Sequence, residues 1–237
     1  MKHFAKIILL LLFATTLHAQ KDFKPEFVIG AGGGVNLAKV SFLPEIEQHT
    51  SILYNAGIMA RYVAEKHLGI QAELNFSQRG WDENSGGQYQ YSRTMNYLEM
   101  PVMAHIYFGR KARFFVNLGP KIAFLLKEQE NSKNLPASDN APQHASCDRK
   151  FDYGICAGGG FEHGIGNFRY ALEGRYHFGL ADIFKNGTKN DFERSSHQYI
   201  SVNLVLMYEA KSKKQVASDR IIVVKREKER KEKEPKE

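Results

Sequence analysis

The sequence lacks a long hydrophobic run. Its most apolar stretch, residues 7–13, is far shorter than the ~18–20 apolar residues that a membrane-spanning helix requires. No later stretch is longer, so the sequence argues against a helical inner-membrane protein.

Cysteine is also scarce, since the chain has 2, Cys147 and Cys156. If residues 149–161 form one strand, the two lie roughly 30 Å apart at ~3.3 Å per residue. A disulfide needs Cα atoms within about 7 Å of each other. We therefore predict no intramolecular disulfide, with Cys147 in a loop and Cys156 on a strand.

The body of the chain has no excess of positive charge. The formal net charge is +7, but residues 1–19 contribute +2 and residues 211–237 contribute +5. Residues 20–210 are therefore neutral. Nucleic-acid binding draws most of its affinity from clustered positive charge, so we predict no nucleic-acid partner.

The N-terminus has the three parts of a secretory signal. Lys2 and Lys6 precede the apolar residues 7–13, and a small residue, Ala19, precedes Gln20. This pattern predicts a signal peptide over residues 1–19, cleaved between Ala19 and Gln20, and a short periplasmic lead over residues 20–26. Because no cysteine lies near the cleavage point, lipid attachment there is excluded.

Residues 68–81, LGIQAELNFSQRGW, carry the strongest structural signal in the chain. Apolar side chains alternate with polar ones from Leu68 to Ser77, and the polar set includes Glu73. Successive side chains of a strand point to opposite faces, so one face is apolar and the other polar. The pattern lasts for the ~9–11 residues that a tilted strand needs to cross a bilayer.

Seven further segments repeat this alternation, which predicts an all-β fold. We expect an eight-stranded antiparallel up-and-down transmembrane β-barrel over residues 27–210, with strands near residues 27–40, 51–64, 68–81, 91–107, 112–126, 149–162, 167–180 and 197–209.

The connections between these segments alternate in length. Those after strands one, three, five and seven are long, and those after two, four and six are short. Outer-membrane barrels have short periplasmic turns and longer external loops. We therefore expect a location in the outer membrane, in contact with its lipid, with both ends of the mature chain in the periplasm.

The polar faces of these strands predict charges inside the barrel. An eight-stranded barrel is only wide enough for its side chains to fill, and a buried ion needs a partner. We expect a structural charge network, joined by Arg169, with Cys156 as a small lining residue. A conducting pore or a catalytic carboxylate pair is the alternative. The predicted network comprises Arg61, Glu73, Glu99, Lys121, Glu162, Glu173 and Arg175.

Aromatic residues near the strand ends distinguish a membrane barrel from a soluble one. A soluble β-sandwich or lipocalin-like barrel would turn its apolar face inward and need no aromatic belt. We expect the following residues at the two membrane interfaces, as an aromatic girdle: Phe27, Tyr54, Tyr62, Phe76, Trp81, Tyr91, Tyr107, Phe114, Tyr153, Phe161, Phe168, Phe178 and Tyr208.

Two motifs are suggestive of other chemistry but incomplete. The string GAGGGV at residues 30–35 has Val35 where a dinucleotide-binding fingerprint needs glycine, and strand pattern follows where a helix should. Inward glycines instead leave room for long side chains from facing strands. His177 and the run Ser195-Ser196-His197 could suggest a lipid hydrolase, but no acid partner is evident. We predict no catalytic, cofactor-binding or metal-binding residues.

Two further features have structural consequences. Pro101 falls at an inward position of its strand and cannot donate a ladder hydrogen bond, so we expect a bulge or a local break there. Residues 211–237 form a charged tail with a small apolar patch at residues 221–224. The tail is either solvated or a periplasmic docking peptide that adds a strand to a partner protein.

The chain resembles the PorT-like outer-membrane β-barrel family. The resemblance rests on the Gly-rich first strand ending in Asn36, on NYLEMPVMAHIYF from Asn96, FVNLGPKIAFLL from Phe115, FDYGICAGGGFE from Phe151 and RYHFGLADIF from Arg175. It implies a small outer-membrane barrel, and one namesake member is associated with the type IX secretion apparatus. We expect a non-enzymatic structural or interaction protein, with a secretion component as the alternative and a hydrolase last.

Overall fold

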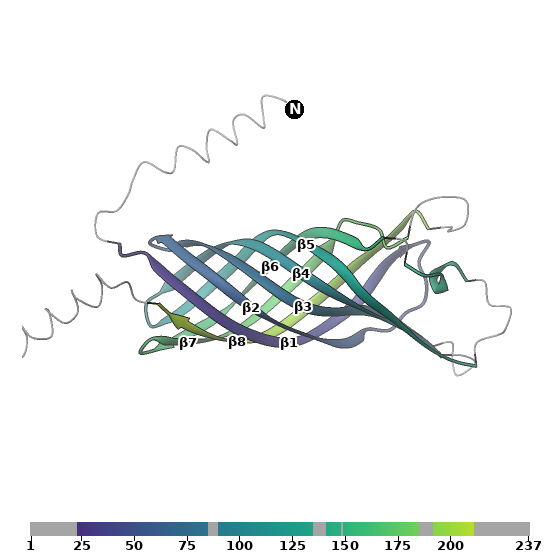
Figure 1. Cartoon of the computed structure of the whole chain (residues 1–237), viewed down its shortest axis with the longest axis horizontal. Coiled ribbons are helices and arrows are strands. Elements are labelled where there is room, and N and C mark those ends of the chain that lie inside the picture. The colour runs from purple at the N-terminus through teal and green to yellow at the C-terminus, as the bar shows by residue number, and fades with distance from the viewer. Residues whose placement is uncertain (1–22, 85–89, 135–140, 148, 185–191, 211–237) are drawn as a thin grey trace, which may run out of the picture.

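The protein is an eight-stranded β-barrel. A computed structural model describes residues 23–84, 90–134, 141–147, 149–184 and 192–210 (Figure 1). The strands are β1 (Glu26–Leu43), β2 (Ser51–Glu65), β3 (Leu68–Asn84), β4 (Gln90–Gly109), β5 (Ala112–Lys133), β6 (Phe151–Ile165), β7 (Phe168–Gly179) and β8 (Arg194–Glu209).

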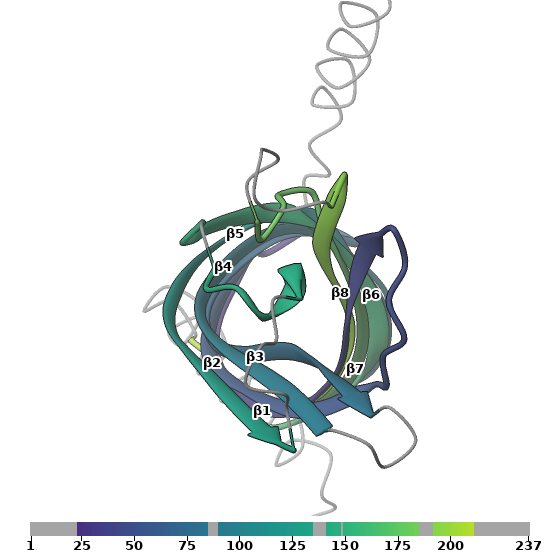
Figure 2. The same cartoon turned by 90° about the vertical axis from the view of Figure 1, so that its right-hand side faces the viewer.

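Each strand pairs antiparallel with its neighbours in sequence, and β1 also pairs with β8, which closes the ring (Figure 2). The predicted up-and-down barrel is therefore confirmed. The first and last described residues lie at one end, where the amide of Ala210 donates to the carbonyl of Phe27. The turns after β2, β4 and β6 share this end, called here the terminus end, and the longer connections lie at the opposite, loop end.

The apolar side chains of the strands point away from the barrel axis. Leu74, Leu172 and Leu204 are 39%, 52% and 68% exposed, whereas the side chains of Glu73 and Glu173 are only 8% and 3% exposed on the inner face. A soluble barrel would bury the apolar set, because water would otherwise meet it. The observed arrangement suits a bilayer as the surrounding solvent, with an apolar band around the outside.

Strands β3, β4 and β5 extend beyond this band at the loop end. The sequence predicts that these strands cover residues 68–81, 91–107 and 112–126, and these bounds are too short, since β3 continues to Asn84, β4 covers Gln90–Gly109 and β5 continues to Lys133. The outward side chains of the extension are polar, for example Asp82, Thr94 and Gln129, so the lipid-facing pattern used to find strands ends before the strands do.

The aromatic girdle is only partly correct. Trp81, Tyr91 and Tyr107 are 0%, 2% and 3% exposed and lie inside the barrel. The period of two explains this, because Trp81 shares the inward parity of Glu73, and Tyr91 and Tyr107 share that of Glu99. The remaining aromatic residues named above face outward, with Phe178 half-buried.

Pro101 lies within a continuous strand. The pairing of β4 with β5 has the same register before and after Pro101. The pairing of β4 with β3 is interrupted, with no paired residues between Val102 and Glu99. The expected local break is therefore present. The register shift of β4 against β5 lies elsewhere, at Asn96 and Tyr97.

Apolar side chains fill both ends of the interior. The cluster at the loop end, called here the mouth core, contains Val40, Phe42, Trp81, Tyr91, Met95, Tyr97, Ala123, Leu125, Ile183, Phe184 and Phe192. A second cluster near the terminus end contains Val28, Met59, Val63, Tyr107, Phe115, Ala171 and Met207. Within the described residues, no helix is sufficiently long and apolar to cross a membrane.

Several predictions concern residues outside the described ranges. These are the signal peptide with its cleavage between Ala19 and Gln20, most of the lead over residues 20–26, and the tail over residues 211–237. The two cysteines are not joined by a disulfide, with Cys156 buried on the inner face of β6 as expected and Cys147 in a connection.

Candidate functional site: the barrel interior and its mouth

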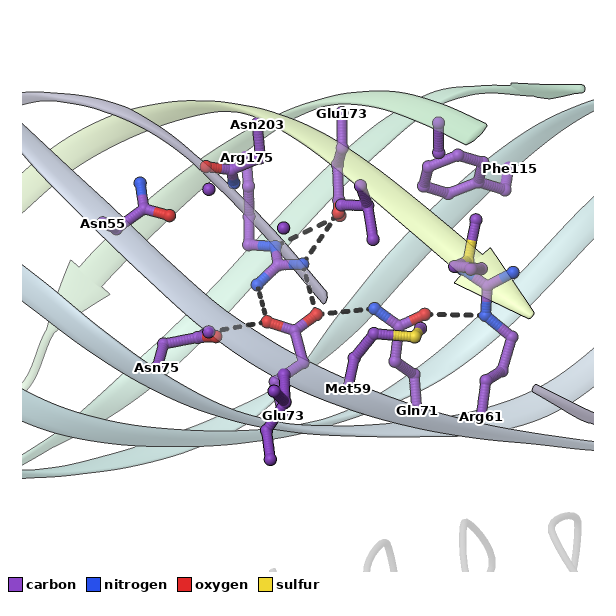
Figure 3. A pocket seen from close by; sticks show the side chains of 17 residues that line it. Asn55, Met59, Arg61, Gln71, Glu73, Asn75, Phe115, Glu173, Arg175 and Asn203 are labelled. Atoms are coloured by element: carbon purple, nitrogen blue, oxygen red, sulfur yellow. Dashed lines mark hydrogen bonds and ion pairs between the residues drawn. The ribbon is translucent and has the colours of Figure 1, made fainter. Parts of the chain in front are cut away.

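The middle of the barrel holds a set of paired charges, called here the lower charge cluster: Arg61, Glu73, Glu162, Glu173 and Arg175. Arg175 on β7 donates to both oxygens of Glu73 on β3, at 2.9 and 2.7 Å, and to Glu173 at 2.8 Å (Figure 3). The side chains come from strands on opposite walls, so barrel closure brings them together.

Amide side chains complete the shell around Glu73. Gln71 and Asn75, the inward neighbours of Glu73 on β3, donate to its carboxylate at 2.6 and 2.8 Å. Gln71 in turn accepts from Arg61 at 2.7 Å (Figure 3). Arg61 also donates to Glu162 at 2.7 Å. The carboxylate of Glu73 thus has four donors, which offsets the cost of its removal from water.

A second set, the upper charge cluster, lies toward the loop end and contains Arg79, Glu99, Lys121 and Asp152. Arg79 donates to Glu99 and, at 2.5 Å, to Asp152. Lys121 donates to Glu99 at 3.2 Å, and the hydroxyl of Tyr199 donates to the same oxygen at 2.6 Å. All of these side chains are buried.

The cavity between the walls is small. It has a volume of about 30 Å³ and is lined by Glu73, Arg175 and inward glycines of β1 and β2 (Figure 3). A water needs roughly 10–15 Å³ measured in this way, so the cavity has room for about two waters. The glycines permit the close approach of neighbours: a Cβ at Gly57 would lie 2.8 Å from the Cα of Asn75, its partner on β3.

Arg93 organises the mouth at the loop end. Its guanidinium donates to the carbonyl oxygens of His144 and Ala145, at 3.0 and 2.5 Å, and to Glu130 on β5. It also lies 5.4 Å from the ring centre of Trp81. These bonds hold residues 141–147, including the short helix η2 (Pro142–His144), across the opening, as Figure 2 shows in a view into this end.

A ring of ion pairs closes the terminus end. Arg113 donates to both oxygens of Glu26, at 2.9 and 2.8 Å, and Arg169 donates to Glu209 at 3.0 Å. Arg169 and Arg113 also approach Glu162, at 3.6 and 3.5 Å. This ring ties the start of β1 to β5 on the opposite wall and the end of β8 to its neighbour β7.

The structure thus divides the seven predicted network residues into two clusters. Glu99 and Lys121 lie in the upper charge cluster, and the other five lie in the lower one, with Arg169 beside it. Sequence reasoning missed Arg79, Asp152 and Arg93. All three lie within the strands predicted from sequence. Arg79 and Arg93 share the inward parity of Glu73 and Glu99, and Asp152 shares that of Cys156, so parity could have placed them inside.

The serine and histidine residues do not form the arrangement considered from sequence. Ser196 accepts from Arg194 at 3.1 Å, and His197 contacts the hydroxyl of Tyr97 at 3.1 Å. Another set contains the same residue types: Nε2 of His177 lies 3.1 Å from the Ser201 hydroxyl, but its Nδ1 lies 3.6 Å from Glu99, beyond hydrogen-bond distance.

Burial decides what that set can do. Ser201, His177 and Glu99 are each 2% exposed, and the 30 Å³ cavity is lined by other residues. A serine nucleophile needs room for a substrate carbonyl beside it, which this part of the described interior does not provide. Within the described ranges, no group of three or more His, Cys, Asp or Glu side chains could hold a metal ion.

Comparison with known proteins gives one family match. Residues 18–185 match the family model described as outer membrane protein beta-barrel domain. No curated protein matches this chain.

Solved outer-membrane barrels are similar in outline. OprG from Pseudomonas aeruginosa is 10% identical, with a TM-score of 0.46 over 79% of this chain and 96% of OprG. Neisserial surface protein A is 13% identical, with a TM-score of 0.40 over 77% and 98%. Ail of Yersinia pestis, in complex with the heparin analogue sucrose octasulfate, is 14% identical, with a TM-score of 0.39 over 78% and 99%.

Proposed function

Because this chain belongs to the outer membrane protein β-barrel domain family, and so resides in the cell outer membrane, we propose that it is a barrel with a closed interior and a structural or protein-interaction role. The observation that carries this proposal is the filling of the interior along its length by the terminus-end ring, the two charge clusters and the mouth core. Eight strands leave just enough width for such filling.

Conductance in planar bilayers tests the closed interior. Purified, folded protein is expected to give no stable ohmic channels, because each cluster spans the lumen with paired side chains. The comparison is a double variant, Glu73→Gly with Arg175→Gly. It removes the two side chains that cross the middle of the lumen. Regular channels from the unaltered protein would overturn the closed-interior proposal.

The interaction role is proposed to lie at both ends of the molecule. The loop end carries the polar extension of β3, β4 and β5, and the terminus end leads into the charged tail over residues 211–237. The proposed orientation, with both termini in the periplasm, follows the rule that outer-membrane barrels keep their short turns there. A periplasmic protein bound by the tail should co-purify with the full chain and be lost when residues 211–237 are deleted. Retention of every partner by the truncated chain would contradict tail docking.

The PorT-like resemblance supplies a second, finer proposal, a role in type IX secretion. The family match is broader than that resemblance. The discriminating experiment is deletion of the gene: a secretion component would trap exported cargo in the periplasm, whereas a structural barrel would leave secretion unchanged.

Absence of enzymatic activity is likewise a proposal, supported by the burial of Ser201 and His177. A fluorophosphonate probe should leave the folded protein unlabelled. Labelling that disappears in Ser201→Ala would reverse this conclusion.

A further inference from the structure

A basic site lies at the edge of the apolar band on β1, β8 and β7. Lys39 is the first polar outward residue of β1 beyond Leu37, and Gln198 is the corresponding residue of β8 beyond Ile200. Both lie on the loop-end side of the band. They therefore stand at the level where lipid tails give way to headgroups, if the band matches the bilayer core.

Strand register places the side chains of this site in one row. Lys39 pairs with Gln198 across β1 and β8, and Gln198 pairs with Phe178 across β8 and β7. Neighbouring strands are about 4.8 Å apart, so the row spans about 10 Å. Tyr176, the next outward residue of β7, donates its hydroxyl to Gln198 at 3.3 Å.

Arg194 folds back onto this row. Its guanidinium lies 5.2 Å from the ring centre of Phe178, and its Nε donates to Ser196 at 3.1 Å. These contacts hold the cation against the barrel wall, and among the described residues no side chain or backbone group accepts from its terminal nitrogens. An exposed lysine and a positioned guanidinium thus flank one amide side chain.

The surroundings favour an anion with an apolar tail. No outward position of β1, β7 or β8, all within the described chain, carries a carboxylate. Toward the terminus end, the row continues directly into Leu37, Ile200 and Tyr176, which face the lipid. Phosphate is well matched by an arginine fork and a lysine ammonium.

We propose that Lys39, Arg194 and Gln198 bind the phosphate-bearing headgroup of an anionic lipid, whose acyl chains lie against Leu37 and Ile200. Position at the end of the band selects a lipid over a free phosphate ion, because Lys39 is exposed, Arg194 is half-buried, and only a membrane-anchored anion is concentrated beside them. Under the proposed orientation, this lipid belongs to the external leaflet.

Native mass spectrometry of the full mature chain in detergent, with added monophosphoryl lipid A, tests the site. Each basic residue near a membrane surface contributes about fivefold to the binding of an anionic surface. Lys39→Gln and Arg194→Gln should therefore each lower the lipid adduct about fivefold, and the double variant about 25-fold. The matched control is Lys66→Gln with Lys111→Gln, which removes two exposed lysines at the terminus end and should leave the adduct unchanged.

Three outcomes would overturn the proposal. They are an unchanged adduct in the Lys39→Gln and Arg194→Gln double variant, equal loss in the control variant, and equal binding of lipid A that lacks phosphate. Displacement by excess inorganic phosphate would instead identify a free-anion site and also reject the lipid. Faster migration of unboiled samples verifies that each variant is a folded barrel, so failure of this site is distinguishable from failure of the barrel itself.

Discussion

The barrel wall in the apolar band and its extension at the loop end have opposite polarity. In the band, outward residues such as Leu74 face lipid while Glu73 and Arg175 lie inside. In the extension, Asp82 and Gln129 lie outward while Trp81 and Met95 fill the mouth core. Side chains alternate between the two faces with the same period of two in both regions. The medium around the barrel changes from hydrocarbon to water, so apolar side chains face outward in the band and inward in the extension.

The comparison also separates two ways to close a narrow barrel. In the band, charged side chains are paired with oppositely charged side chains on other strands. Removal of one charged side chain therefore leaves its partner buried without a counter-charge. At the mouth, aromatic packing excludes water and a single arginine ties a loop across the opening. The following predictions test the two regions against each other, from the largest effect to the smallest.

Arg175→Met should destabilise the barrel most, by about 5 kcal/mol, because it leaves both Glu73 and Glu173 without their cation. Urea unfolding in detergent micelles, followed by tryptophan fluorescence and by gel mobility, measures the change. Adding Glu73→Gln and Glu173→Gln to Arg175→Met should recover much of the loss. A triple variant as unstable as Arg175→Met would show that packing, and not charge compensation, sets the cost.

Trp81→Ala should cost about 4 kcal/mol, since it empties a fully buried site in the mouth core. The same unfolding measurement, followed by gel mobility, gives the value. The control is Phe114→Ala, an aromatic residue that is 68% exposed on the outside of the band and leaves no cavity. An equal effect of the two substitutions would contradict the inward position of Trp81.

Leu204→Arg should cost about 3 kcal/mol, because it places a charge on the lipid-facing wall near the middle of the apolar residues of β8. Gln129→Arg, at an outward position of the extension, should be nearly neutral. Refolding yield and unfolding in lipid vesicles compare the two. If Gln129→Arg proved as costly as Leu204→Arg, the extension would lie in the bilayer and the inversion of polarity would be wrong.

Arg93→Gln should have the smallest effect on stability, about 2 kcal/mol, because it removes charge-assisted bonds at one end only. Its spectroscopic effect is more specific. The chain has 1 tryptophan, so the emission of Trp81 should shift to longer wavelength as residues 141–147 leave the mouth. Arg149→Gln, an exposed residue in the same connection, is the control and should leave the emission unchanged.

Most of the barrel could be predicted from sequence because its signal is local. Leu98, Met100 and Val102 face lipid, and Glu99 faces inward, as the alternation alone indicates. For the interior, the sequence predicts which residues lie inside but not which of them pair. The pairing of Arg175 with Glu73 depends on the curvature that brings β7 opposite β3, and no spacing in the chain encodes it.

The errors at Trp81 and Tyr91 share a cause. Aromatic residues at strand ends are typical of membrane interfaces, but these two side chains lie inward, at a level where the outward face of the strands is already polar. Parity was available in the sequence and would have placed both side chains inside. The change of solvent along β3, β4 and β5 was not available, since it depends on how far those strands project past their neighbours.

The sequence by itself determined the number of strands, their antiparallel order and which side chains face lipid, because each of these follows from a two-residue period repeated over a bilayer's width. The tertiary structure decided which charges compensate one another and how the mouth closes. Those contacts join residues far apart in the chain, and only the closed ring of strands fixes the distances between them.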